Sequence, residues 1–226
     1  MIADPRAVAA RWPEPRIRAL AELAAVTTEA PWALSRAHHE RARDAGLSDD
    51  DVLHAIALAA FFGHLNRIAD AVDVPLDYRV RRDPPRAEPA TPPFLAAPPP
   101  TALPALPALT LARRGPTAAA LAAWMNHVAR PSPALDGYGR AMIATRVGRL
   151  LGDVTGEAPP RTDLDRALLE LADRITLAPW QLDAASYAAL RAAGLDDRGL
   201  FDACVVASSA GVFSRIEVAL AALGRE

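Results

Sequence analysis

The sequence contains one 54-residue stretch twice, and this repetition constrains the fold more than any other feature. Residues 18–71 align without a gap to residues 166–219, and 23 of the 54 aligned positions are identical, where roughly 10% identity is expected by chance in an alanine-rich chain. Eight identities are alanines; the others include Pro31/Pro179, Trp32/Trp180, Arg43/Arg191, Gly46/Gly194 and Arg67/Arg215. A duplicated unit folds the same way twice, so positions that differ between the copies are not dictated by the shared scaffold.

Each copy predicts three helices. In the first copy, apolar residues recur at helical spacing over about 16–28. Pro31 is typical of a first helical turn and Gly46 of the position after a helix end, so a second helix is predicted between them. The third helix is predicted from Ser48, which opens an acidic capping sequence, to about Val74. The second copy repeats these signals at Thr162, Pro179, Gly194 and Asp196.

The stretch between the copies has two parts. Residues 81–116 hold 11 of the 21 prolines, which predicts an extended linker draped over a surface. Residues 118–130 and 133–152 show helical spacing again. Strand-like alternation is not found, so the sequence predicts an all-α protein. We expect a first repeat over 1–80, the linker over 81–116, and a helical pair with the second repeat over 117–226.

Composition excludes several classes of chemistry. The chain has no Lys, one Cys and a net charge of −2. Schiff-base lysines and P-loop lysines are therefore excluded, as are intrachain disulfides and Cys-x-x-Cys sites. Neither a nucleic-acid partner nor an anionic membrane is expected at this charge. The N-terminus lacks the apolar run of a signal peptide, and the charged residues within 200–223 favour a buried helix, so we expect a soluble cytoplasmic protein.

Two strings indicate a family. The second helix ends in Ala-Arg-Asp-Ala-Gly-Leu-Ser over 42–48, and the third ends in Asn-Arg-Ile-Ala-Asp over 66–70. In this order and duplicated, they resemble the carboxymuconolactone decarboxylase / alkylhydroperoxidase-D (AhpD-like) superfamily. Residues 116–152 are similar to the helices that precede the core in its larger members. The resemblance implies an AhpD-like helical bundle with two repeats of three helices, and a homo-oligomer, dimer or trimer.

The chain departs from this family at its reactive positions. Redox members carry Cys-x-x-Cys-x-x-x-His with a nearby Glu, and the alignment places the family His at His38. The cysteine positions then fall on Pro31 and Leu34 in the first copy, and on Pro179 and Leu182 in the second. Without a thiolate, thiol peroxidase chemistry is excluded. The lone Cys204 aligns with Ile56 and is predicted to be a core side chain, while the spacing of Glu22 and Glu170 does not suit a proton relay.

Histidines are the remaining candidates for acid–base chemistry. His38 and His54 are predicted at similar depth, about 10 Å from the turn between their helices, where both could face one pocket. The alternative is that His54, like His39, lies on a solvated surface. His64 falls about 80° from the helical face of His54, so we expect no three-histidine metal site and no cofactor.

Arg67 and Arg215 recur near the end of otherwise apolar helices. Such a buried charge requires a carboxylate, a helix C-terminus or a bound anion.

These candidate residues and the family resemblance leave two possible functions. The first is a cofactor-independent acid–base enzyme, decarboxylase- or lyase-like, acting on a small organic acid. There His38 would be the general base or acid, His54 would assist, and Arg67 or Arg215 would hold a carboxylate. The second is a catalytically inactive binding or assembly module of the same fold.

Overall fold

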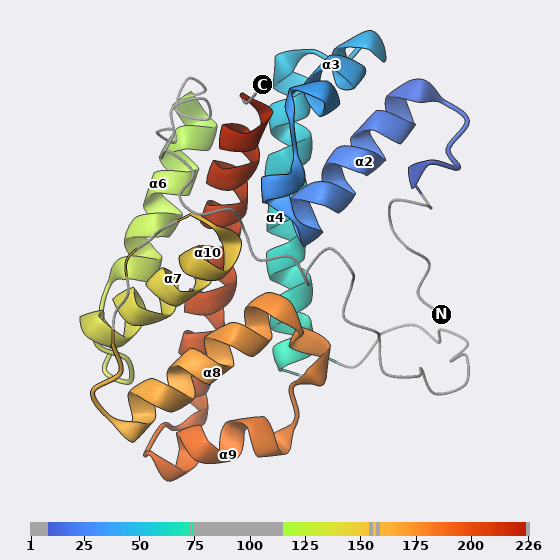
Figure 1. The fold of residues 1–226 in the computed structure, drawn as a ribbon. Coiled ribbons are helices and arrows are strands. Elements are labelled where there is room, and N and C mark those ends of the chain that lie inside the picture. The colour runs from blue at the N-terminus through green and yellow to red at the C-terminus, as the bar shows by residue number, and fades with distance from the viewer. Residues whose placement is uncertain (1–8, 73, 75–114, 154–155, 157–158, 225–226) are drawn as a thin grey trace, which may run out of the picture.

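The computed structural model describes residues 9–72, 74, 115–153, 156 and 159–224, and these are helical with no strand among them. The all-α prediction is confirmed for this part of the chain. The described residues form eight α-helices and two short 3₁₀ turns, and Figure 1 labels the helices. They are α2 (Pro15–Glu29), η1 (Pro31–Ala33), α3 (Arg36–Asp44), α4 (Asp49–Ala71), α6 (Gly115–Ala129), α7 (Gly137–Leu151), α8 (Asp163–Leu177), η2 (Pro179–Gln181), α9 (Ala184–Ala192) and α10 (Asp197–Leu223).

The elements of the two copies begin at equivalent positions. The helices α2, α3 and α4 and the turn η1 each begin 148 residues before α8, α9, α10 and η2 respectively. The residue before each turn has nearly the same backbone, with φ −149° and ψ 69° at Ala30 and φ −149° and ψ 59° at Ala178. The aligned sequences therefore adopt the same local structure, including an irregular connection that propensity does not dictate.

The second helix of each copy begins later than predicted. Pro31 and Pro179 open one 3₁₀ turn instead of a continuous helix, because the residues that follow, Leu34 and Leu182, are extended. The helices α3 and α9 start only after new N-caps at Ser35 and Asp183. Proline fixes its own φ but cannot propagate a helix through an extended residue.

Most other helix ends lie where the sequence places them. Ser48 and Thr162 form capping boxes with Asp51 and Asp165, each hydroxyl accepting from the backbone three residues on. Gly46 and Gly194 have φ of 81° and 95°, the left-handed conformation that a helix C-terminus favours in glycine. The helix α4 ends at Ala71 rather than near Val74.

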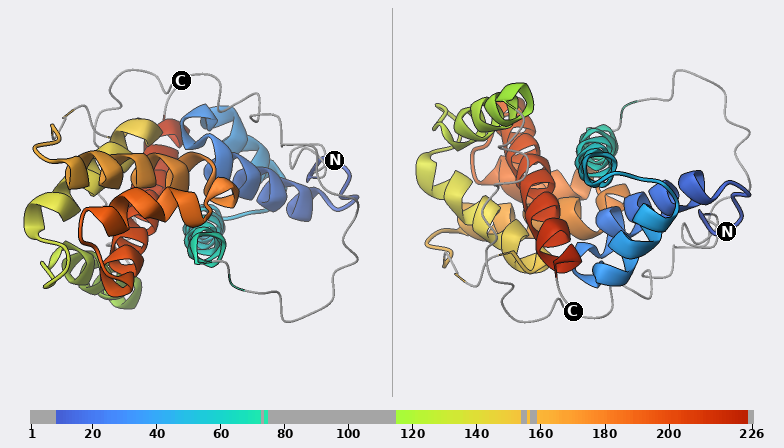
Figure 2. Two further views of the ribbon diagram at one scale, coloured as in Figure 1. Left: turned by 90° about the horizontal axis from the view of Figure 1, so that it is seen from below. Right: turned by 90° about the horizontal axis from the view of Figure 1, so that it is seen from above.

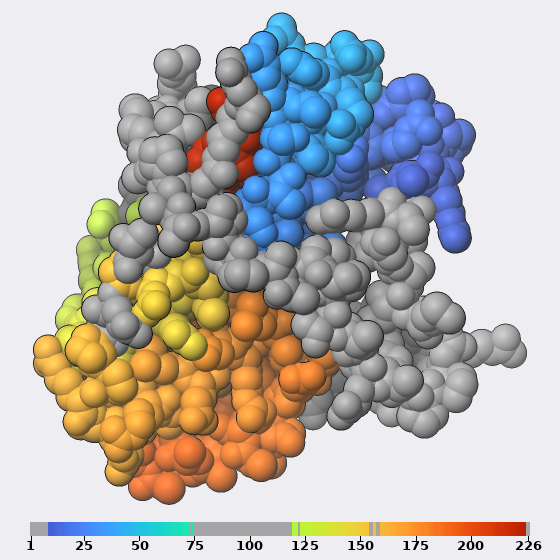
Figure 3. Space-filling model, in the orientation of Figure 1, coloured from blue at the N-terminus to red at the C-terminus, as the bar shows by residue number. Residues whose placement is uncertain are grey.

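The longest helix, α10, belongs to two apolar cores. Its first half packs with α7 and α8, around Met142, Ile143, Leu168 and Leu171. Its second half packs with α2 and α4, around Leu23, Val26, Ile56 and Val212. Figures 1 and 2 show α10 beside α4 and running in the opposite direction. In the space-filling view, α2 and α3 form the upper part of one face and α8 and α9 the lower part (Figure 3).

Contacts between the two copies are reciprocal. The helix α10 packs on η1 of the first copy, and α4 packs on η2 of the second. The Tyr187 hydroxyl of α9 donates to the Ala71 carbonyl at the end of α4. Each copy thus completes part of the other's packing.

Two expectations concern other parts of the chain. The predicted linker over 81–116 lies almost entirely outside the described residues, which resume at α6. By length and composition α4 and α10 could each cross a membrane, but a core helix passes the same test. Most of α10 is buried within the bundle, as its charged residues led us to expect.

Candidate functional site

A small polar cluster surrounds His38 where α3 packs on α2. The Ser35 Oγ lies 2.9 Å from the His38 Nδ1, and the His38 Nε2 lies 3.7 Å from the Glu22 Oε1. The Arg41 guanidinium donates to the same Glu22 oxygen at 2.8 Å. Two nitrogen-bearing side chains from one face of α3 therefore converge on one carboxylate. We call Glu22, Ser35, His38 and Arg41 the His38 cluster.

Local structure sets this arrangement. Ser35 is the N-cap of α3, and its hydroxyl contacts the ring of His38 rather than a backbone N–H. Leu34, just before α3, and Ala42 within it are buried in the core that α2 and α4 share, which anchors α3. The His38 side chain is 17% exposed, so it is mostly shielded but still reaches solvent.

Glu22 is a site residue that sequence reasoning missed. Its spacing from His38 did not match the family pattern, yet the packing of α2 on α3 brings the two side chains together. The available signal was its identity with Glu170 in the second copy. There the cluster is absent, because Ser186 replaces His38 and forms a capping box with Asp183.

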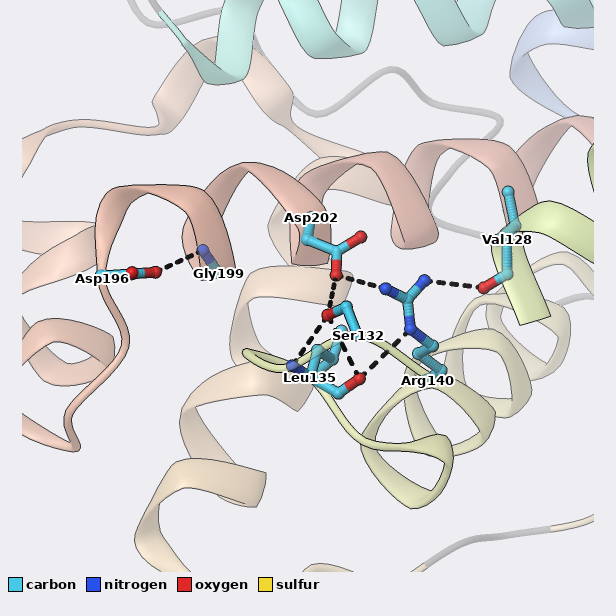
Figure 4. Close-up of polar contacts among 7 residues, drawn as sticks. All are labelled: Val128, Ser132, Leu135, Arg140, Asp196, Gly199 and Asp202. Atoms are coloured by element: carbon cyan, nitrogen blue, oxygen red, sulfur yellow. Dashed lines mark hydrogen bonds and ion pairs between the residues drawn. The ribbon is translucent and has the colours of Figure 1, made fainter. Parts of the chain in front are cut away.

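His54 lies outside the His38 cluster. It is exposed on α4, while the cluster is formed by α2 and α3. Its counterpart on α10, Asp202, accepts from the Ser132 hydroxyl at 2.5 Å and from the Arg140 guanidinium. Figure 4 shows this guanidinium held between Asp202 and the Val128 carbonyl, which fastens the α6–α7 hairpin to α10.

Arg215 is a structural clamp in the core. Its Nε donates to the Thr28 carbonyl at 3.0 Å, and a terminal nitrogen lies 3.4 Å from the Thr176 carbonyl. These carbonyls belong to the last turns of α2 and α8, whose C-termini carry partial negative charge. Burial lowers the pKa of Arg215, and the nearby Arg67 lowers it further. This is the helix-end contact that the sequence left open as an alternative to anion binding.

Arg67 has fewer partners than Arg215. Its NH1 donates to the Gly63 carbonyl at 2.9 Å, while its Nε is buried without a hydrogen-bond partner. Burial lowers the pKa of Arg67 to about 10, against the opposing effect of Asp70. The hydrogen bonds of the two arginines lie away from the His38 cluster. Arg67 bonds Gly63 of α4, and Arg215 bonds Thr28, which is six residues, or about 9 Å along α2, from Glu22.

His64 occupies an aromatic site between α4, α6 and α10. Its ring meets the Trp124 ring edge-on at 5.0 Å between centroids, and its Nδ1 is buried without a hydrogen-bond partner. The Trp124 Nε1 in turn donates to the Ser209 hydroxyl. Burial lowers the pKa of His64, with the Ser208 backbone partly opposing this, so the ring is neutral at physiological pH.

The positions that the sequence resemblance aligns with the family cysteines are largely packed. Pro31, Pro179 and Leu34 are buried, and Leu182 is half-buried. Cys204 is a buried side chain on α10, as predicted, and burial raises the pKa of its thiol to about 11. A thiol with so high a pKa is a poor nucleophile.

Among the described residues, no group of three or more His, Cys, Asp or Glu side chains could hold a metal ion. No family model matches the chain, and neither a curated protein nor a solved structure matches it. The site must therefore be interpreted from its own geometry.

Proposed function

We propose that this chain is an internally duplicated, thiol-free relative of the carboxymuconolactone decarboxylase / AhpD-like superfamily that performs acid–base chemistry on a small organic acid. The reaction takes place at the His38 cluster. The observation that supports this most is the convergence of His38 and Arg41 on one oxygen of Glu22.

Each side chain of the cluster has a distinct role. The His38 Nε2 is 3.7 Å from Glu22, longer than a hydrogen bond, so a substrate atom can compete for it. As a base, Nε2 takes a proton from the substrate while Nδ1–H is donated to the Ser35 hydroxyl. Glu22 stabilises the imidazolium that forms. The half-exposed Arg41 has further N–H groups with which to bind a carboxylate. We assign the carboxylate to Arg41 rather than to Arg215, because Arg215 already donates to the Thr28 and Thr176 carbonyls.

Proton exchange at carbon tests this function without knowledge of the product. The protein is incubated in D₂O with a panel of β-keto, unsaturated and hydroxy acids, and deuterium incorporation next to the carboxylate is followed by NMR. His38→Gln is expected to slow exchange by about 100-fold or more. The matched control is His39→Gln, because His39 pairs with Asp49 on the surface. Exchange that is absent for the whole panel, or equal in wild type and His38→Gln, contradicts the proposal.

One observation favours the inactive binding or assembly module instead. The position of His38 serves as a helix-capping position in the second copy, where Ser186 bonds Asp183. On this alternative, His38→Gln changes only the stability of α3. A loss of stability without any loss of proton exchange would select the module.

A further inference from the structure

The helix α4 exposes an uninterrupted apolar stripe. Leu58, Phe61, Phe62 and Leu65 are 56%, 40%, 58% and 43% exposed, and their spacing of three, four and seven residues places them on one face. Val72, 43% exposed, continues this face toward the end of the helix. From Val52 to Asn66 the sequence has no Asp, Glu or Arg, whereas a helix face meant for solvent normally carries charges. We call these five residues the α4 stripe.

The same face is covered in the second copy. The counterparts of Leu58, Phe61 and Phe62 on α10 are Val206, Ser209 and Ala210, and all three are buried. There α7 packs on α10 and Trp124 of α6 bonds Ser209. The first copy has no equivalent hairpin among the described residues. The face that helices bury in one copy is therefore largely exposed in the other, where the Phe61 ring meets Trp124 of α6 edge-on at 6.0 Å between centroids.

We propose that the α4 stripe is an interface with a second copy of this chain, in which two α4 helices pack antiparallel about a two-fold axis. A single apolar stripe is complementary to itself in this arrangement. Taking about 200 Å² for a large side chain, the exposed parts of the stripe amount to about 480 Å² per copy, which is more than half of what one partner of a standard interface buries.

A membrane is a poorer occupant of the stripe. Helices that lie on membranes carry Lys and Arg beside their apolar face. The helix α4 instead begins with Asp49, Asp50 and Asp51, and Arg67 is turned inward to the Gly63 carbonyl. The proposal is independent of catalysis at His38, since both the enzyme and the module could assemble in this way.

The antiparallel pairing predicts which positions meet. The two-fold axis passes the centre of Leu58, Phe61, Phe62 and Leu65, which lies between Phe61 and Phe62. Phe62 then lies within about 2 Å, along the axis, of its own counterpart. Leu58 lies about 10 Å from its counterpart along the axis and opposite Leu65 of the partner subunit. Because the native Cys204 is buried, single introduced cysteines report these distances with wild type as the background.

Sedimentation and cross-linking test the interface. Wild type is expected to sediment as a dimer of the 24.0 kDa chain and Phe62→Glu as a folded monomer. Phe201→Glu is the control, since Phe201 is equally exposed on α10 outside the stripe. Under mild oxidation, Phe62→Cys should form a disulfide-linked dimer. Leu58→Cys alone should not, but mixed with Leu65→Cys it should.

Three results would overturn the proposal. One is a wild-type monomer at high concentration, which would mean that the stripe is open or covered by the chain itself. Another is recruitment of wild type to phosphatidylcholine vesicles through Phe62. The third is a dimer that persists in Phe62→Glu. If Phe62→Glu does not fold, the cross-linking pattern decides alone, and equal cross-linking at Phe62 and Leu58 would reject the antiparallel geometry.

Discussion

At the scale of single residues, two glycines explain how the paired arginines are held. A Cβ added at Gly63 or Gly211 would lie 2.8 Å from the NH1 of Arg67 or Arg215, so each glycine admits the guanidinium one turn away. Arg215 is further fixed by the carbonyls of Thr28 and Thr176, whereas the Nε of Arg67 has no hydrogen-bond partner.

We therefore expect Gly211→Ala and Gly63→Ala to change the free energy of unfolding by different amounts. Gly211→Ala should lower the free energy of unfolding by about 1–3 kcal/mol, because it displaces a buried guanidinium that donates to three backbone carbonyls. Gly63→Ala should stay within about 1 kcal/mol of wild type, since the entropic gain of Gly→Ala in a helix offsets a small shift. Urea unfolding of both variants measures this, and equal losses would contradict the distinction.

The sequence could predict these residues but not their partners. The identities Gly63/Gly211 and Arg67/Arg215 are visible in the alignment, and a helix-end contact was among the alternatives. Arg215 bonds the ends of α2 and α8, which belong to different copies. This contact depends on long-range packing, which the sequence does not show. Glu22 shows the same limit, because its contact with His38 arises from the approach of α2 to α3 rather than from spacing along the chain.

Glu217 predicts a pH dependence of stability. Burial, aided by the nearby Asp153, raises the pKa of Glu217 from 4.5 to about 7. The folded state then binds this proton more tightly than the unfolded state. The contribution of Glu217 to stability is therefore fully present below pH 4.5 and is lost as the pH rises through 7.

Glu217→Gln removes this dependence and should stabilise the protein at pH 8 but not at pH 4.5. Because Glu217 is only half-buried, the gain is roughly 1 kcal/mol or less. Thermal or urea unfolding at both pH values measures the difference, with the exposed Glu170→Gln on α8 as the control. A gain that is the same at both pH values would show that charge is not its cause.

At the scale of helices and turns, local signals fixed the ends where a side chain caps the backbone. Ser48, Thr162 and Asp196 all cap as their positions predict. The starts of α3 and α9 were predicted wrongly, because Pro31 and Pro179 fit the first turn of a 3₁₀ segment as well as that of an α-helix. Tertiary contacts with α10 and α4 decide between these options.

The α6–α7 hairpin depends on Asp202 of α10. Asp202→Ala would leave Arg140, a buried residue, without its carboxylate, which we expect to lower the free energy of unfolding by about 3 kcal/mol. The aligned change in the first copy, His54→Ala, removes an exposed side chain and should cost less than about 0.5 kcal/mol. Chemical unfolding followed by circular dichroism compares the two. Equal effects would mean that Asp202 does not hold the hairpin.

At the scale of the whole molecule, the sequence predicts two repeats joined by a linker, with boundaries at 80 and 116. Periodicity identifies the helices of each repeat but not which helices share a core. In the structure α10 supplies side chains to both cores, and Trp32 of η1 packs against the core of the second copy. Such exchange leaves no local signal, because each contributing residue is simply apolar at helical spacing.

Shared helices predict that the two copies unfold together. Leu23 and Leu171 are aligned, identical and almost fully buried, one in each core. Leu23→Ala and Leu171→Ala should each cost about 2–5 kcal/mol. Both should shift one common transition, because the loss of either core exposes half of α10 and so destabilises the other core.

The measurement is urea unfolding followed in parallel by circular dichroism and tryptophan fluorescence. Coincident curves are expected in wild type and both variants. A variant that splits the curve, with one phase keeping the wild-type midpoint, would mean that the copies fold as separate domains with the boundaries that the sequence suggested.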